Sequence, residues 1–456
     1  MPQPNAATQF ITQLAHELGY KAYIFGYPLV LMDLTRQVGT NVSVAGEFSA
    51  PINQFAHARQ FPDDTFTTVV TPNVDTLYSS AFLDLSEGPM VLSLPEMDER
   101  YYLMQMMDAW TNVFESIGTR TTGNGPSDYA IVGPDWTGTL PDRLRKIQAP
   151  TNMVWIIGRT QTNGKSDYST VHSLQDQYQL VSLQSWRSAP QTSAILPVST
   201  IVDMVTPPSE QVAQMQVTAF FNRLNLLMKD NPPARADDPT MHSLAPVGIF
   251  PGKPFSMSRL NPLVAEGFES GFHDAQRELI EHAANAQGKV INGWAITDKV
   301  GIYGTDYRTR ALVALAGLGA NLPADAVYLH ATREMNGEPL NGRNRYSITF
   351  PSGQLPPARA FWSITMYDSN HRLVKNPINR FALGDRDSMQ FNQDGSLTLL
   401  IQHGSSDQRY ESNWLPAPDG NFNLVLRIYW PDERLSKGNW SPPRIRHLTL
   451  MAENAA

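Results

Sequence analysis

The sequence contains no cysteine among its 456 residues. Disulfide bonds, thiolate nucleophiles, zinc ribbons and iron–sulfur clusters are therefore excluded. It also lacks a long hydrophobic run, because the most apolar early stretch, residues 22–32, is too short to span a membrane and contains Gly26 and Pro28. The chain as given shows no signal-peptide pattern. We expect a soluble, cytoplasmic protein without a membrane partner, or a periplasmic or secreted one if a signal has been removed.

Charge of one sign is not concentrated in any part of the chain. The 35 basic and 43 acidic residues give a net charge of -8 without a basic stripe, so no nucleic-acid partner is expected. The familiar catalytic motifs G-x-S-x-G, H-E-x-x-H, P-loop and G-x-G-x-x-G are missing. The ten histidines are dispersed, and we predict no metal and no cofactor, although a metal held by distant residues stays an alternative.

The patterns that are present predict a mainly β protein with an α-helical insert. Apolar residues at four-residue spacing predict a helix over residues 6–25, which Gly26 and Pro28 should end. Short alternating runs separated by turn signals predict an N-terminal β-sandwich, and Asn-Gly and Asp-Gly pairs after residue 326 predict a second, jelly-roll-like one. We divide the chain into an N-terminal helical segment (1–45), a β-sandwich (46–205), a helical connecting region (206–322) and a C-terminal β domain (323–456).

Two carboxylates interrupt the apolar strand faces of residues 71–123. Asp75 falls on the face of Leu77 and Leu83, and Asp108 falls in a row with Met104 and Met106. A carboxylate in such a row must find a partner or take up a proton, because unpaired burial costs several kcal/mol. The structural alternative is that each aspartate caps a turn or pairs with an arginine.

These residues form the predicted site. Aspartates with shifted pKa values can serve as an acid–base pair, while tyrosine and arginine stabilise a developing oxyanion. Because clefts between domains favour ligands, we expect the two β domains to share the site. The predicted catalytic residues are Asp75, Asp108, Tyr78 and Tyr102, and the predicted substrate-binding residues are Trp110, Asn112, Arg120, Tyr307, Arg308 and Arg310.

Two function classes fit this set of residues. The first is a hydrolase or lyase without a redox cofactor, acting on a small organic molecule or saccharide through carboxylate and tyrosine chemistry. The alternative is a non-catalytic carbohydrate-binding or assembly protein, since 10% of the residues are aromatic and aromatic faces stack on sugar rings.

An internal similarity relates the strand that ends at Asp108 to the one that ends at Asp368. The segments 91–108 and 346–368 both contain a strand, a proline-marked connection, an aromatic pair and a methionine-bearing strand that ends in aspartate. If both aspartates cap the same type of turn, their role is structural.

Longer runs resemble a known pair of domains. RYYLMQMMDAWTNVFESIGTRTTG and APTNMVWIIGRTQTNG are similar to the DUF1254 domain, and PLNGRNRYSITFPSGQLPPARAFWSITMYD and NWLPAPDGNFNLVLRIYWP are similar to its usual partner, DUF1214. The resemblance implies a β-sandwich, a helical arm region and a jelly-roll-like domain, in members that can assemble as oligomers. We therefore expect a homo-oligomer, but the resemblance brings no catalytic residues.

Overall fold

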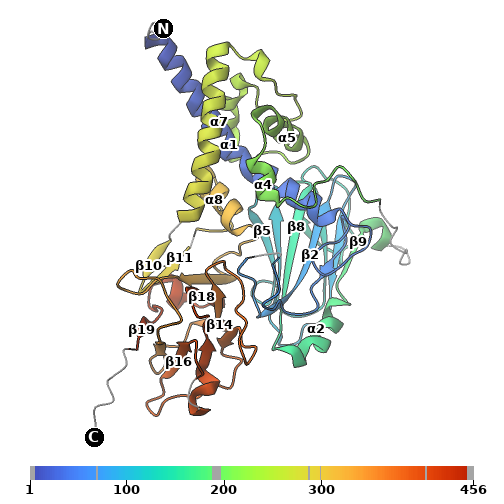
Figure 1. The fold of residues 1–456 in the computed structure, drawn as a ribbon. Helices are drawn as coiled ribbons and strands as arrows, with labels where there is room; N and C mark the ends of the chain where they lie inside the picture. The colour runs from blue at the N-terminus through green and yellow to red at the C-terminus, as the bar shows by residue number, and fades with distance from the viewer. Residues whose placement is uncertain are drawn as a thin grey trace.

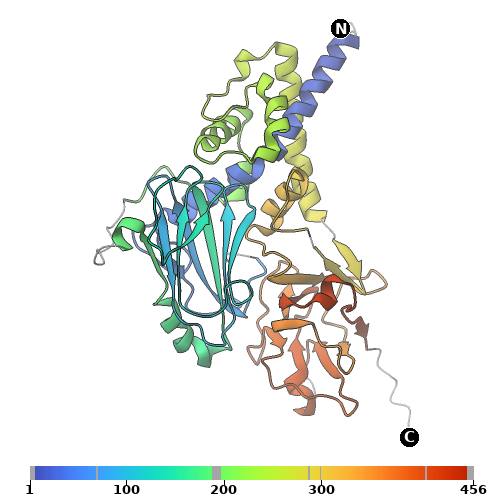
Figure 2. The same ribbon diagram turned by 180° about the vertical axis from the view of Figure 1, so that it is seen from behind.

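The computed structural model describes residues 6–67, 70–186, 197–285, 288–297, 299–405 and 408–448. Two β domains lie side by side, and a helical arm projects from them (Figures 1 and 2). This arrangement confirms the predicted mainly β fold with a helical insert between two β-rich ends. The termini of the predicted first and last segments, residues 1–5 and 449–456, lie outside the described part of the chain.

The N-terminal domain is a sandwich of two sheets. One sheet has the order β1 (Ala56–His57), β2 (Thr76–Asp84), β8 (Met153–Gln161), β4 (Tyr102–Asp108) and β5 (Val113–Gly118). The other has the order β7 (Arg145–Gln148), β6 (Ser127–Val132), β3 (Met90–Leu94) and β9 (Gln179–Ser182). Leu83, Leu92, Met104, Ile131 and Val154 fill the core between the sheets. As the alternation predicts, every second residue of β2, β4 and β8 points into this core.

The C-terminal domain also has two sheets. The larger has the order β10 (Lys289–Ile291), β11 (Trp294–Ile296), β12 (Ala326–Ala331), β18 (Phe422–Pro431), β14 (Ala358–Asp368) and β15 (Ala382–Gly384). The smaller has the order β17 (Trp414–Pro416), β16 (Leu397–Gln402), β13 (Tyr346–Phe350) and β19 (Ile445–His447). One face of β12, β18 and β14 packs on the smaller sheet through apolar residues such as Leu329, Ile364 and Leu426. Their other face carries polar and aromatic side chains.

The helical arm is built mainly from α1 (Ala6–Thr40) and α7 (Pro262–Asn285), with α4 (Pro208–Ala213), α5 (Val217–Asp230), α6 (Asp238–Leu244) and α8 (Tyr307–Gly317) packed around them. Shorter helices α2 (Tyr168–Gln175), α3 (Leu183–Trp186) and α9 (Glu433–Ser436) belong to the β domains. Within the described ranges, no helix is both long and apolar enough to cross a membrane.

The predicted end of the first helix at Gly26 and Pro28 is wrong. The helix continues to Thr40, and every residue from Ala22 to Leu34 is buried. A proline inside a helix costs about 3 kcal/mol, and we attribute its tolerance here to burial of this stretch in one apolar core with Phe220, Leu224 and Phe272. At Gly26 a Cβ would lie 2.5 Å from the Leu224 side chain, so glycine is needed for close packing.

Candidate functional site

The two predicted catalytic carboxylates lie at opposite ends of β8. The carbonyl of Asp75 accepts a hydrogen bond from Thr162 N at 3.0 Å, whereas Asp108 pairs with Val154. Eight residues of strand separate these positions, which corresponds to about 26 Å. The structure therefore does not bring the two carboxylates together, and their assignment as one acid–base pair is wrong.

Asp108 caps the turn between β4 and β5. Its Oδ1 accepts hydrogen bonds from Trp110 N at 2.9 Å and Asn112 N at 2.8 Å, and its Oδ2 accepts one from Asn112 Nδ2 at 3.1 Å. Burial raises the pKa of Asp108 to about 6, although the hydrogen bonds from Asn112 lower it. Both oxygens of this carboxylate therefore accept hydrogen bonds within its own turn.

Asp368 caps a turn of the same type. Its Oδ1 accepts hydrogen bonds from Asn370 N at 2.8 Å and Arg372 N at 2.9 Å, two and four residues ahead, as in the turn after Asp108. Both turns place a non-glycine residue at positive φ, Thr111 at 68° and His371 at 59°. The two aspartates are equivalent in structure, and the turn-capping alternative applies to both.

Asp75 forms the main ionic contact between the two β domains. Its carboxylate accepts hydrogen bonds from Arg386, in the loop after β15, and from Ser363 Oγ at 2.7 Å. The Arg386 guanidinium lies 4.4 Å from the centroid of the Phe361 ring. Asp75 is fully buried, and Arg386 is the ionic partner that a carboxylate on this apolar strand face was expected to need.

Three predicted residues gather where the helical arm meets the N-terminal sheet. The buried Arg310 guanidinium lies 5.2 Å from the Trp110 ring and 5.1 Å from the Tyr307 ring, and its Nε and Nη2 have no hydrogen-bond partner. Burial lowers the pKa of Arg310, while Asp237 and Asp108 raise it. Tyr307 donates to Asp237 Oδ1 at 2.9 Å. This group belongs to the packing of α8 against the sheet.

The other predicted residues are dispersed. Tyr102 lies in the sandwich core and donates to the carbonyl of Gly123 at 3.0 Å. Arg120 pairs with Asp325 at 2.6 Å, and Arg308 contacts His282 at 2.9 Å.

Two surface cavities are found, and neither is lined by Asp75, Tyr78 or Tyr328. A cavity of about 300 Å³ lies between α1 and the start of α8 and is lined by Tyr20, Lys21, Ile24, Thr305, Asp306, Tyr307 and Arg308. Another, of about 350 Å³, is lined by Met97, Asp98, Glu99, Arg100, Gln161, Asn163, Thr170 and Leu174. The two cavities share no residue with each other.

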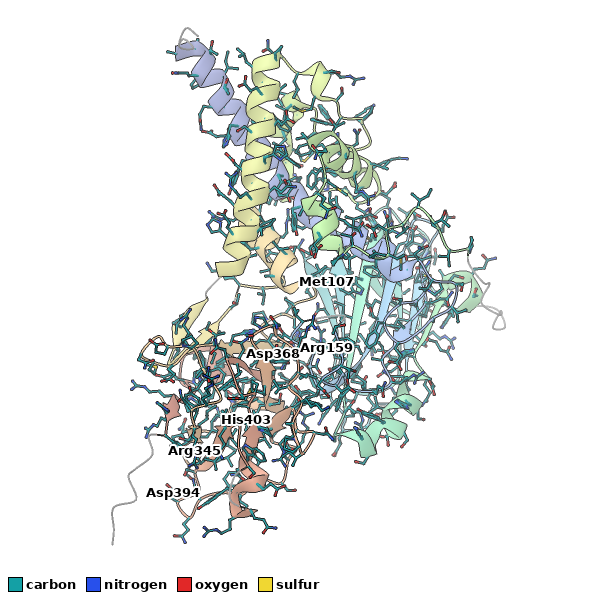
Figure 3. The ribbon with its side chains drawn as sticks, viewed as in Figure 1. Met107, Arg159, Arg345, Asp368, Asp394 and His403 are labelled. Atoms are coloured by element: carbon teal, nitrogen blue, oxygen red, sulfur yellow. The ribbon has the colours of Figure 1, made fainter. Side chains whose placement is uncertain are left out.

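The junction between the β domains contains several buried polar side chains, among them Asp75, Arg159 and Arg427. Strand register places Tyr328, Arg427 and Ser363 in one row across β12, β18 and β14, on the face that points away from the C-terminal core. On the N-terminal sheet, Tyr78 and Arg159 occupy paired positions on the face that points away from its core. Figure 3 labels Arg159 at this junction, with Met107 further along the same sheet towards the helices.

Two buried guanidinium groups lie at this junction. Arg159 belongs to the N-terminal sheet and Arg427 to the C-terminal sheet. Arg159 donates to the carbonyl of Gly319 at 3.1 Å, lies 5.1 Å from the Tyr78 ring and leaves its Nε without a partner. Arg427 donates to Thr365 Oγ1 and to the Tyr367 hydroxyl, both at 2.8 Å. Among the described residues, neither arginine forms an ion pair with a carboxylate. Buried cations usually have such a partner.

Two phenol hydroxyls near these arginines each accept a hydrogen bond from an asparagine side chain. Asn73 Nδ2 donates to the Tyr78 hydroxyl at 2.7 Å, and Asn321 Nδ2 donates to the Tyr328 hydroxyl at 2.5 Å. Each phenol oxygen thus acts as an acceptor, and within the described ranges no acceptor is recorded for either phenol proton. The hydroxyl of the nearby Tyr429 is buried without a hydrogen-bond partner.

The junction keeps contact with solvent. Tyr78 and Tyr328 are half-buried, and His330, on the same strand face as Tyr328, is exposed. Surrounding protein nevertheless raises the pKa of Tyr328, although Arg159 lowers it, and burial together with Arg427 and His371 lowers the pKa of His330 to about 4.

Sequence reasoning missed Arg159, Tyr328, His330 and Arg427. A signal existed for Arg427, because alternation in β18 places it with Tyr429 on the face opposite Leu424 and Leu426. A charged residue inside a strand that is buried on both faces indicates that the face opposite the core packs against another part of the protein. The partner surface itself lies far away in the chain and gives no local signal.

Comparisons with known proteins agree with this architecture. Residues 52–182 match the family model described as protein of unknown function DUF1254, and residues 325–433 match the one described as protein of unknown function DUF1214. No curated protein matches the sequence. Within the described ranges, no group of three or more histidine, aspartate or glutamate side chains is placed to hold a metal ion.

Two solved structures are similar to the chain. The VPA0106 protein from Vibrio parahaemolyticus has a TM-score of 0.73 at 22% identity, over 95% of this chain and 100% of its own. An uncharacterised protein from Burkholderia cenocepacia has a TM-score of 0.43 at 11% identity, over 97% of this chain and 96% of its own. The first likeness supports the fold alone.

Proposed function

Because the chain belongs to the two-domain DUF1254/DUF1214 family, whose function is described as unknown, we propose a function from the geometry of the domain junction. The protein is a hydrolase or lyase that binds a small organic molecule between the β domains and uses no redox cofactor. The supporting observation is that Tyr78 and Tyr328 each accept a hydrogen bond from an asparagine amide, and that the Arg159 guanidinium lies 5.1 Å from the Tyr78 ring without a carboxylate partner among the described residues.

These groups suit a carbonyl or carboxylate oxygen. A phenol whose oxygen already accepts a hydrogen bond is oriented to donate its own proton, and fixed donors stabilise negative charge that develops on a substrate oxygen. Arg159 adds a positive charge in a desolvated place, where its effect on an oxyanion is larger than in water. The proposal keeps the tyrosine and arginine chemistry predicted from sequence and moves it away from the two aspartates.

The test is binding of small carboxylates. Calorimetric titration of the protein with acetate, benzoate and succinate should give saturable binding of at least one probe, and the neutral analogue benzamide should bind more weakly than benzoate. The Tyr78→Phe variant, which removes one hydroxyl and leaves the ring, should bind about tenfold more weakly, since one hydrogen bond to a charged group contributes about 1.5 kcal/mol or more.

Arg100→Met serves as the control variant. Arg100 pairs with Asp167 and donates to the carbonyl of Gln161 at the 350 Å³ cavity, and among the described residues no contact joins it to Tyr78, Tyr328 or Arg159. Its affinity for the probes should equal that of the wild type. The proposal is overturned if none of the three carboxylates binds, or if Tyr78→Phe binds as tightly as the wild type while Arg100→Met loses binding.

A further inference from the structure

His330 is the one histidine on the polar face of β12. It lies two residues from Tyr328 on the same strand face, which places the two about 6.6 Å apart along the strand. Arg427 sits directly across from Tyr328 on β18, and Val425 sits directly across from His330. His330 therefore points to the same junction as the phenol of Tyr328.

The surroundings of His330 keep its ring neutral. The charged and titratable groups that act on it are Arg427, from β18, and His371, from the loop after β14, and the neighbouring phenol is Tyr328. Burial, Arg427 and His371 lower the pKa of His330 to about 4, so the ring is unprotonated at neutral pH. His330 is exposed, so a ligand at the edge of the junction can reach its ring.

We propose that the site takes a carbonyl compound with an acidic C–H bond next to the carbonyl, and that His330 removes this proton while Tyr78 and Tyr328 hold the carbonyl oxygen. This inference rests on the proposed function and narrows it from a hydrolase or lyase to a lyase that begins by removing a proton from carbon.

The proposed step is balanced without a redox partner. The electron pair of the C–H bond forms a carbon–carbon double bond, the carbonyl π electrons move onto the oxygen, and the proton goes to a ring nitrogen of His330. The enolate oxygen accepts hydrogen bonds from both phenols, and the positive charge of Arg159 stabilises its negative charge. His330 then returns the proton to carbon, or a group on the adjacent carbon leaves with its electron pair and takes the proton.

Carbon-acid chemistry fits the residues better than hydrolysis by a serine. The Ser79–His57 pair has the required contact, 2.9 Å between Oγ and Nδ1, but Ser79 is fully buried under the N-terminal sheet and does not face the junction. A base of low pKa is sufficient for enolate formation when phenol hydrogen bonds stabilise the oxyanion. That combination is the one found at the junction.

The experiment measures deuterium exchange. The protein is incubated in D2O with pyruvate, 2-oxobutyrate, acetoacetate and acetone, and incorporation of deuterium next to the carbonyl is followed by NMR. Wild-type protein should accelerate exchange of at least one probe over buffer. His330→Gln should lower this rate at least tenfold, whereas His242→Gln, at an exposed helix position, should leave it unchanged.

Two further readouts separate the failure modes. His330→Gln should keep the wild-type melting temperature and benzoate affinity, so that a lost rate reports the base and not the fold or the site. The His330 resonance should titrate near pH 4, and the exchange rate should rise through that pH and stay level above it. Benzoate binding without any accelerated exchange, or equal exchange in His330→Gln, overturns the inference and leaves the binding site standing. Absence of carboxylate binding overturns the proposed function itself.

Discussion

Tyr78 and Tyr328 come from different β domains, and each phenol oxygen accepts a hydrogen bond from an asparagine amide, at 2.7 Å from Asn73 and 2.5 Å from Asn321. Burial raises the pKa of Tyr328, Arg159 lowers it, and Tyr78 raises it. The site that we propose therefore takes one phenol from each domain and requires both domains to be in place.

The Tyr328→Phe variant tests the contribution of the C-terminal domain to this site. It should weaken benzoate binding by about tenfold, as Tyr78→Phe does, because each removes one donor to a charged oxygen. The double variant should lose more than either single variant. Calorimetric titration measures all three, and a double variant that binds like the wild type would contradict a shared site.

Asp75→Ala should destabilise the protein strongly. It leaves Arg386, whose side chain is 19% exposed, without its carboxylate at the domain junction, and breaking a buried ion pair costs about 3–5 kcal/mol. Urea unfolding at pH 7 measures the change in the free energy of unfolding. Lys437→Ala, which breaks an exposed pair with Glu433, should change stability by less than about 0.5 kcal/mol. Equal effects of the two variants would show that Asp75 does not hold the domains together.

Asp108→Asn should remove part of the pH dependence of stability. The folded-state pKa of Asp108, about 6, lies above its ordinary value of 3.8. The folded protein therefore binds the proton more tightly, and its stability falls as pH rises from about 4 to 6, by a few kcal/mol at most. Asparagine retains an oxygen for Trp110 N and Asn112 N, so the variant should match or exceed the wild type at pH 8.

Urea unfolding of both proteins between pH 4 and 8 measures this difference. Because burial also raises the pKa of Asp385 to about 6, the informative quantity is the difference between the variant and the wild type at each pH. A difference that does not change with pH would contradict an elevated pKa at Asp108.

Gly271→Ala should destabilise the helical arm. A Cβ at this position of α7 would lie 1.9 Å from the carbonyl oxygen of His16 in α1, so the helices would have to separate, at a cost of about 1–3 kcal/mol. Gly317→Ala is the matched control, since its Cβ meets nothing within 4 Å and alanine favours helix. Thermal unfolding should show a lower Tm for the first and an unchanged or higher Tm for the second.

Local patterns predicted the β architecture because each strand buries alternate residues, as β2 and β18 do. They also indicated that Asp75 must find a partner or take up a proton, and they raised the possibility that Asp108 and Asp368 cap the same type of turn. Local patterns failed to predict the end of the first helix, because packing against segments distant in the chain determines it. Pro28 stays helical inside a core formed with α5 and α7. Arg386 and Arg427 could not be assigned to the site, because their partners Asp75 and Thr71 lie 311 and 356 residues earlier in the chain.

The most direct test of the interdomain site is a crystal structure of the protein with benzoate. We predict the carboxylate between the two β domains, within hydrogen-bond distance of the Tyr78 and Tyr328 hydroxyls and beside the Arg159 guanidinium. Benzoate bound only elsewhere, for example beside Arg100 or between α1 and α8, with the space between the two phenols filled by protein or water, would contradict this site.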